Sequence, residues 1–219
     1  KVNAYEICNE PNVYGFWNSS PPDPARFSEM LCIANARIKV VDPDAIVISG
    51  GLAPVGRIEG TYNGLEGHNF YTMDERTYLA AMLDNGAGAC LDGFGYHPYG
   101  FAYPPETNPD AVSNGFAFRG AEKMHDILVT KGYADMPIWA TEFNWLRRAM
   151  DDGFYCDDDY EYSQYFKWQE VSAQTQADYL VRALQYADDN WPWMHDMFVW
   201  NLDWHNYKPE FPCLHSRYY

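Results

Sequence analysis

The chain has 219 residues, with 15 Lys and Arg against 31 Asp and Glu, so its formal net charge is −16 at pH 7. This acidic balance argues against nucleic-acid binding, which a basic patch normally carries, and against a surface that binds anionic lipid. No window approaches the ~18 consecutive apolar residues of a membrane span, so no transmembrane helix is predicted.

Hydrophobic periodicity predicts strands and helices that alternate along the chain. A strand at 2–8 precedes a helix that Asp23 caps and that ends at Asp42-Pro43. The remaining strands are expected at 45–49, 93–97, 137–142 and 197–201, and the helices between them at 77–85, at 119–131 and after the capping residue Ser172. The last helix is expected to bury one apolar stripe, formed by Ala177, Leu180, Val181, Leu184 and Ala187.

The strand–helix order predicts a parallel sheet of βα units, which is either an open doubly wound sheet or a (β/α)₈ TIM barrel. No Gly-rich phosphate-binding motif follows any strand, so the dinucleotide-binding open sheet loses its main support. Glu10, His97, Glu142 and Trp200 lie at or after the carboxyl ends of strands, where a barrel gathers its active site. We therefore predict an α/β TIM barrel. Only five of eight units are found, so the remainder must come from the same chain or another chain.

Neither the cysteines nor the acidic clusters predict a metal site. The five cysteines are far apart and lack zinc-ligand spacing, so we expect ordinary, mostly buried cysteines and no disulfide scaffold. Their odd number leaves at least one thiol free unless it pairs with another chain. The segment 143–171 is long for a βα loop and carries acidic clusters at 151–152 and 157–159. These clusters lack calcium-loop spacing, which favours a solvated acidic loop. No metal and no cofactor is predicted.

Two carboxylates, Glu10 and Glu142, each close an apolar strand. A glycosidic bond is cleaved by one carboxylic acid that protonates the leaving oxygen and a second carboxylate that attacks the sugar or activates water. Two carboxylates at one barrel mouth fit this chemistry, although 31 acidic residues offer many pairs. Spacing alone is therefore weak evidence.

Five segments resemble strands four to eight of clan A glycoside hydrolases, and they follow the family's order. YEICNEPN at 5–12 resembles the fourth-strand signature, IVISGGLAP at 46–54 the fifth strand and DGFGYHPY at 92–99 the sixth. WATEF at 139–143 is similar to the seventh strand and FVWNL at 198–202 to the eighth. The likeness is to cellulase-like proteins near glycoside hydrolase families 39 and 5. It implies that residues 1–219 are the C-terminal portion of a single barrel domain, without strands one to three and the last helix.

The resemblance implies a role for each matching residue. Glu10 matches the general acid/base and Glu142 the nucleophile of a retaining mechanism, in which one carboxyl is protonated and the other ionised at rest. Asn9 matches the residue that binds the sugar 2-hydroxyl. The sixth-strand pair near the nucleophile is matched by His97 and Tyr99, and the eighth-strand sugar platform by Trp200.

Two residues depart from the family pattern, Cys8 where Trp or Gly is common and Asn144 where Gly is usual. They leave room for a second hypothesis, a non-catalytic carbohydrate-binding or cell-surface structural protein on the same scaffold.

Aromatic residues make up 17% of the chain, and several follow the candidate catalytic residues in loops. Trp17 and Trp145 are the predicted walls of a sugar-binding cleft, with Tyr14, Phe16, Phe101 and Tyr103 as further candidates. Loop packing is the alternative for each. The leading prediction is a retaining hydrolase of a β-linked poly- or oligosaccharide, located outside the cell or at the cell surface.

Overall fold

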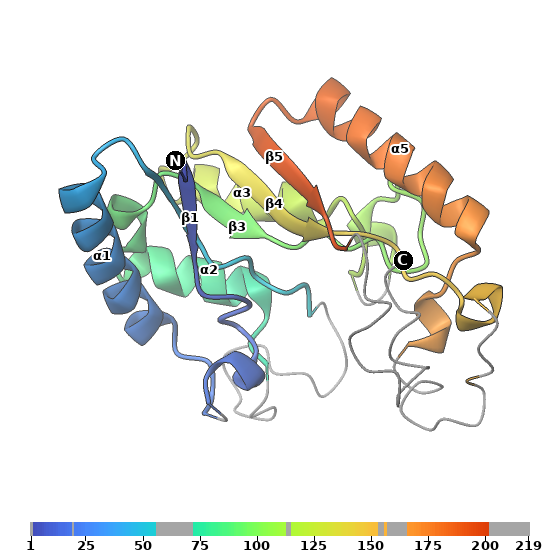
Figure 1. Ribbon diagram of the computed structural model, residues 1–219, viewed down its shortest axis with the longest axis horizontal. Coiled ribbons are helices and arrows are strands. Elements are labelled where there is room, and N and C mark those ends of the chain that lie inside the picture. The colour runs from blue at the N-terminus through green and yellow to red at the C-terminus, as the bar shows by residue number, and fades with distance from the viewer. Residues whose placement is uncertain are drawn as a thin grey trace.

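The computed structural model describes residues 2–18, 20–55, 72–112, 115–152, 156 and 166–201. Strands and helices alternate along these residues as the sequence predicts (Figure 1). In chain order they are β1 (Ala4–Ile7), α1 (Pro24–Val41), β2 (Ile46–Ser49), α2 (Glu75–Asp84), β3 (Phe94–Tyr96), α3 (Gly120–Thr130), β4 (Ile138–Phe143), α5 (Ala173–Asn190) and β5 (Met194–Val199).

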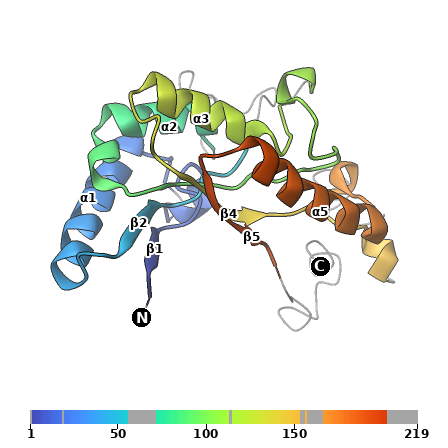
Figure 2. The ribbon, with the colours of Figure 1, turned by 90° about the horizontal axis from the view of Figure 1, so that it is seen from above.

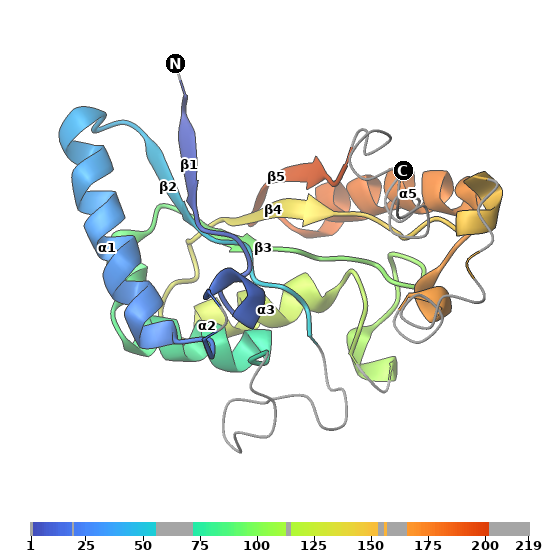
Figure 3. The same ribbon diagram turned by 60° about the horizontal axis from the view of Figure 1, so that its bottom comes forward.

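All strand pairs in the described residues are parallel. β1 pairs with β2, and β4 pairs with both β3 and β5. Isolated parallel bridges from Ile48 to Gly93 and from Leu52 to Tyr96 link the two groups, so the strands follow one another in sequence order. Figure 2 shows the helices along one side of the strands, and Figure 3 shows β3, β4 and β5 side by side. This part of the chain forms an open arc of parallel βα units and no closed barrel.

Side-chain caps begin α1, α2 and α5, and two of the three are the capping residues that the sequence predicts. Asp23 accepts a hydrogen bond from the Arg26 amide at 2.9 Å, and Ser172 accepts one from the Thr175 amide at 3.1 Å. The helix expected from residue 77 begins at Glu75 instead, because Asp74 caps it. The core lies between the helices and the strands. Its large, fully buried side chains include Phe27, Leu31, Tyr78, Leu79, Phe94, Phe118 and Phe143.

Helix α5 buries only part of the stripe that its sequence predicts, because Ala187 is buried and Leu180 packs against the core while the other three positions are exposed. Ala183 and Ala187 are buried together with Gln176, whereas Val181 and Leu184 are 69% and 46% exposed. The Gln176 amide explains the rotation, because it donates to the backbone carbonyl of Trp145 at 2.8 Å and so turns this face of the helix inward. Three apolar positions of the predicted stripe, with Ala177 among them, therefore face outward at the end of the arc.

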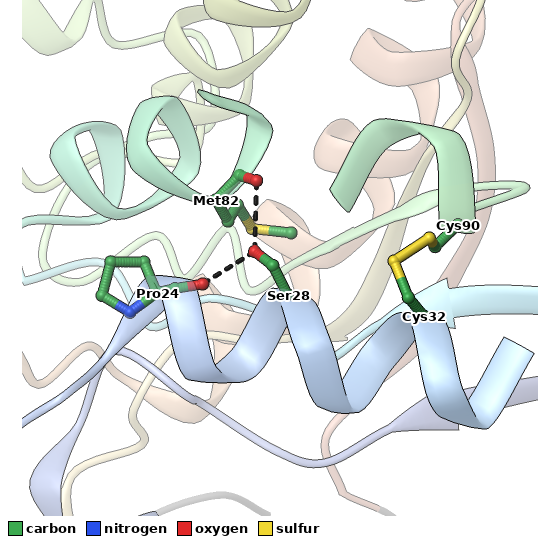
Figure 4. The surroundings of a disulfide bond; sticks show 5 residues. All are labelled: Pro24, Ser28, Cys32, Met82 and Cys90. Carbon is green, nitrogen blue, oxygen red and sulfur yellow. Dashed lines mark hydrogen bonds between the residues drawn. A yellow bond between two sulfur atoms is a disulfide. The ribbon is translucent and has the colours of Figure 1, made fainter. Parts of the chain in front are cut away.

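The sequence predicts no disulfide scaffold and leaves the pairing of the cysteines open; in the structure Cys32 and Cys90 form a disulfide (Figure 4). It joins α1 to the short 3₁₀ helix Ala87–Cys90 that follows α2. Next to it the Ser28 hydroxyl lies 2.7 Å from the Pro24 carbonyl and 3.1 Å from the Met82 carbonyl, which ties α1 to α2. The half-cystines are 58 residues apart, so only the packing of these helices brings them together.

Two further cysteines can be placed. Cys156 is buried and disulfide-bonded, whereas Cys8 is an exposed free thiol. A search of the described helices finds none that is both long and apolar enough to span a membrane.

Candidate active site

Glu10 lies in a tight loop after β1 that the backbone and one buried side chain hold in place. The Glu10 amide donates to the Gly51 carbonyl at 3.1 Å. The fully buried Asn12 side chain donates to the Ala53 and Met73 carbonyls and accepts from the Ala53 amide. Glu10 itself has a φ of 39°, an uncommon value for a residue with a Cβ, and such strain is concentrated at functional sites.

The second carboxylate, Glu142, is the second-to-last residue of β4 and contacts residues from the loop after β3. The Tyr99 hydroxyl donates to Glu142 Oε2 at 2.7 Å, and His97 Nδ1 lies 3.0 Å from Glu10 Oε1 and 3.7 Å from Glu142 Oε2. One oxygen of Glu10, one of Glu142 and a ring nitrogen of His97 all lie within 4.8 Å of one another. Four of the predicted residues therefore meet at the carboxyl ends of β1, β3 and β4.

A layer of residues that the sequence analysis missed lies beneath His97. His97 is fully buried, and its Nε2 is 3.1 Å from Thr141 Oγ1. The Thr141 hydroxyl donates to Glu6 Oε1 at 2.9 Å, and the Gly51 amide donates to the same oxygen at 2.8 Å. A charged residue inside the otherwise apolar run of β1 was a signal that could have indicated Glu6.

Three carboxyl groups, those of Glu6, Glu10 and Glu142, lie near one imidazole, that of His97. Burial raises the pKa of the Glu142 carboxyl; His97 and the hydrogen bond from Tyr99 oppose this rise, whereas Glu10 and Glu6 add to it. Burial disfavours the charged form of His97, yet the hydrogen bond with Glu10 and the neighbouring carboxylates outweigh it and raise the pKa of His97. The ring therefore holds its proton more tightly than an ordinary histidine.

Trp200, the predicted sugar platform, directly follows β5 and is 36% exposed. The buried Asn144 donates from its amide to the Trp200 carbonyl at 2.8 Å, and its oxygen accepts from the Trp145 amide at 2.7 Å. Asn144 therefore connects the end of β4 to the end of β5. This contact gives a structural reason for Asn at a position where the resembling family usually has Gly.

The other predicted aromatic residues differ in position. Trp145 is fully buried and donates to the Tyr103 carbonyl at 2.8 Å, so the prediction that it lines a cleft is wrong and it packs the loop instead. Trp17 is partly buried against the core and donates to the Pro11 carbonyl, in the loop that carries Glu10. Asn9 is partly exposed, next to Glu10.

Phe101, one of the candidate cleft aromatics, forms an aromatic surface with Trp168 and Phe116, two residues that the sequence analysis did not identify. Trp168 is 41% exposed and stacks on Phe101 with ring centroids 5.8 Å apart and an interplanar angle of 6°. Phe116 packs against both rings. Trp168 is therefore held by ring stacking and still exposes part of its side chain to solvent.

The predicted acidic loop lies only partly in the described residues. Asp151 accepts a hydrogen bond from the Ala173 amide at the start of α5, so this carboxylate serves a structural role. The cluster at 157–159 lies outside the described residues. Glu10, His97 and Glu142 are close enough to share a cation, but their polar atoms face one another and Tyr99 at hydrogen-bonding distances, an arrangement suited to proton transfer.

No family model and no curated protein matches the sequence. Three solved structures each match 90% of the chain. One is a monomeric beta-xylosidase from Caulobacter crescentus, with 19% identity and a TM-score of 0.51. The others are a GH128 curdlan-specific exo-beta-1,3-glucanase from Blastomyces gilchristii, with 16% identity and a TM-score of 0.51, and a glucosidase from Croceicoccus marinus, with 17% identity and a TM-score of 0.56. The chain covers 33%, 62% and 32% of these three chains, so it spans less than two thirds of their lengths.

These matched proteins are glycoside hydrolases with TIM-barrel folds. At identities below 20% the likeness concerns the fold: the chain has the architecture of part of such a barrel.

Proposed function

We propose that the chain is the C-terminal portion of a retaining glycoside hydrolase, with Glu142 as nucleophile and Glu10 as general acid/base. The observation that carries this proposal is the pair of carboxylates whose oxygens lie within 4.8 Å. Retaining enzymes place their carboxyl groups about 5–5.5 Å apart, whereas inverting enzymes separate them by about 6.5–9.5 Å to admit a water. The short separation therefore supports direct attack by one carboxylate.

The proposed reaction has two steps. Glu142 attacks the anomeric carbon while the bond to the leaving oxygen breaks and Glu10 transfers its proton to that oxygen, which forms a glycosyl ester on Glu142. Glu10 then takes a proton from water, the water oxygen attacks the anomeric carbon, and the ester bond to Glu142 breaks. Tyr99 stabilises the ionised nucleophile before attack and after its release, because it donates to Glu142 Oε2.

A β-linked poly- or oligosaccharide is the proposed substrate. Trp200 and Trp168 offer exposed aromatic faces near the carboxyl ends of the strands, and Asn9 lies beside Glu10, where the resembling family binds the sugar 2-hydroxyl. Two of the matched structures are named as a beta-xylosidase and an exo-beta-1,3-glucanase. These features support a carbohydrate ligand.

We further propose that three more βα units complete the barrel, from the same polypeptide or another chain. In the described residues β1 and β5 each pair with one strand only, which leaves an edge at each end of the arc. Apolar side chains are exposed at both ends: Ile33, Val40 and Val41 on α1, Val181 and Leu184 on α5, and Phe198 and Val199 on β5. Parallel sheets normally have both faces covered and their edges protected, so these faces suit further barrel units.

An extracellular or cell-surface location agrees with the chemistry of the chain. Disulfides persist in oxidising compartments, and this chain forms one between Cys32 and Cys90. A hydrolase of polysaccharides needs access to polymers outside the cell.

The deciding experiment is covalent trapping in the complete polypeptide that carries these residues. A panel of 2-deoxy-2-fluoro glycosyl fluorides should leave one glycosyl group on Glu142, found by intact mass and peptide mapping, and its sugar would identify the substrate. Glu142→Gln should abolish labelling. Glu10→Ala should slow turnover of substrates with poor leaving groups and yield a glycosyl azide of retained configuration when azide is added. Sugar binding without turnover or adduct would instead favour the non-catalytic carbohydrate-binding protein.

A further inference from the structure

A continuous chain of hydrogen bonds connects Glu6, which the proposed reaction does not use, to the proposed acid/base Glu10. Glu6 Oε1 accepts from the Thr141 hydroxyl at 2.9 Å, Thr141 Oγ1 contacts His97 Nε2 at 3.1 Å, and His97 Nδ1 contacts Glu10 Oε1 at 3.0 Å. This series of hydrogen bonds runs from β1 to β4, then to the loop after β3, and back to the loop after β1. It therefore spans the strands whose ends form the site.

The hydroxyl of Thr141 settles the direction of these bonds. A hydroxyl has one hydrogen to donate, and Thr141 gives it to the Glu6 carboxylate. Toward His97 the same oxygen can only accept, so His97 Nε2 carries a hydrogen. The Gly51 amide donates to the same oxygen of Glu6, which keeps this carboxylate in the accepting role.

Fixing the hydrogen on Nε2 constrains the other side of the ring. If His97 is neutral, Nδ1 is an acceptor, and it faces a carboxyl oxygen of Glu10 at 3.0 Å. Two acceptors at that distance repel each other, so one proton must lie between them, either on Glu10 or on an imidazolium. In both cases Glu10 and His97 together hold one proton, which is the proton that a general acid requires.

Gly51 makes this arrangement sterically possible. A Cβ at this position would lie 2.2 Å from His97 Nε2 and 2.5 Å from Thr141 Oγ1, so any side chain would push the two apart. The Gly51 carbonyl also accepts from the Glu10 amide. One residue thus adjoins both ends of the hydrogen-bond chain.

We propose that Glu6 and Thr141 are positioning residues that hold the Nε2 hydrogen of His97 and thereby keep the transferable proton between His97 Nδ1 and Glu10. The proposal rests on the assignment of Glu10 as acid/base. The titratable groups that face the ring in the described residues are Glu6, Glu10, Glu142 and Tyr99. Thr141 is the contact through which Glu6 acts on the proton.

Two substitutions test the proposal. Thr141→Val removes the acceptor of Nε2–H, so neutral His97 should move its hydrogen to Nδ1 and pair with ionised Glu10, which lacks an acid proton. General acid catalysis contributes about 10²–10⁴-fold, so kcat/KM for a substrate with a poor leaving group should fall by about tenfold to a thousandfold. A dinitrophenyl glycoside needs little acid assistance and should fall by less than about threefold. Thr141→Ser keeps the hydroxyl, so kcat/KM for the substrate with a poor leaving group should return to near the wild-type value.

Glu6→Gln changes the charge but keeps an oxygen that can accept from Thr141 and Gly51. Removing a negative charge near His97 and Glu142 lowers both pKa values, so both limbs of the kcat/KM profile should move to lower pH. The helix-surface variant Thr130→Val should leave the profile unchanged. Thr130 is exposed, and its hydroxyl donates to the Asp126 carbonyl of the same helix at 2.8 Å.

A direct readout is the ¹⁵N spectrum of histidine, in which the protonated and bare ring nitrogens of His97 differ in chemical shift. Nε2 of His97 should be protonated in the wild type and bare in Thr141→Val at a pH where the ring is neutral. A wild-type spectrum with bare Nε2, or equal losses in Thr141→Val on both kinds of substrate, would overturn the proposal. If the wild type forms no glycosyl adduct, the proposed function itself fails, and the ¹⁵N result still decides the position of the hydrogen.

Discussion

Removing the hydroxyl of Tyr99 should weaken catalysis without disturbing the fold. This hydroxyl donates to Glu142 Oε2 at 2.7 Å, and a hydrogen bond to a charged group contributes about 1.5–3 kcal/mol. Since about 1.4 kcal/mol corresponds to a tenfold change in rate, Tyr99→Phe should lower kcat/KM by about tenfold to a hundredfold. The ring itself remains and keeps its edge contact with His97.

The same substitution should change the pH dependence in a defined direction. The hydrogen bond from Tyr99 favours the ionised form of Glu142 and opposes the rise in pKa that burial causes. Without it the pKa of Glu142 rises further. A nucleophile must be ionised, so the acidic limb of the kcat/KM profile should move to higher pH.

The assay is the pH profile of kcat/KM on a dinitrophenyl glycoside, because this leaving group makes the first step insensitive to acid catalysis. Tyr133→Phe is the matched control, because Tyr133 lies between α3 and β4, at the opposite end of β4 from Glu142. An acidic limb that stays in place in Tyr99→Phe, with kcat/KM within about twofold of wild type, would refute the role assigned to this bond. Equal effects of both variants would do the same.

Three further variants test the framework of the site. Replacing Cys32 and Cys90 by Ala opens a loop of 58 residues and should lower the free energy of unfolding by about 4 kcal/mol, measured by urea titration. A decrease of less than about 1 kcal/mol would contradict the loop-entropy argument. Asn144→Ala removes the bond to the Trp200 carbonyl and should cost about 1–3 kcal/mol of stability and raise KM for the sugar; an unchanged KM would show that Trp200 needs no such support. Asn12→Ala leaves the buried Ala53 amide without its side-chain acceptor and should cost about 1–3 kcal/mol, measured by urea unfolding, so full stability would count against this anchor.

Local patterns predict the order of elements in this chain because most of its described helices carry their own start signal. Asp23 and Ser172 cap the helices as expected, and the period of apolar residues identifies the strands. The same patterns misjudge α5. Its apolar residues were assumed to face the core, but Gln176 makes buried hydrogen bonds to the loop after β4 and determines which face turns inward. A polar residue with a distant partner leaves no periodic signal.

The catalytic candidates could be predicted because they lie at strand ends, whereas their supporting contacts could not. Glu10 and Glu142 are 132 positions apart, and the sequence indicates only that both follow apolar strands. Thr141 was passed over because a threonine is ordinary in a strand. The pairing of Cys32 with Cys90 depends on how α1 packs on the segment after α2, which spacing does not reveal.

Gly51 illustrates how one residue can carry information at two levels. In the sequence, Gly50-Gly51 indicates the end of a strand, which is correct for β2. In the structure, the absence of a Cβ at Gly51 admits the contact between His97 and Thr141, its amide holds Glu6, and its carbonyl holds the Glu10 backbone. The residue that ends the strand is therefore also the residue that contacts both ends of the hydrogen-bond chain from Glu6 to the proposed acid/base Glu10.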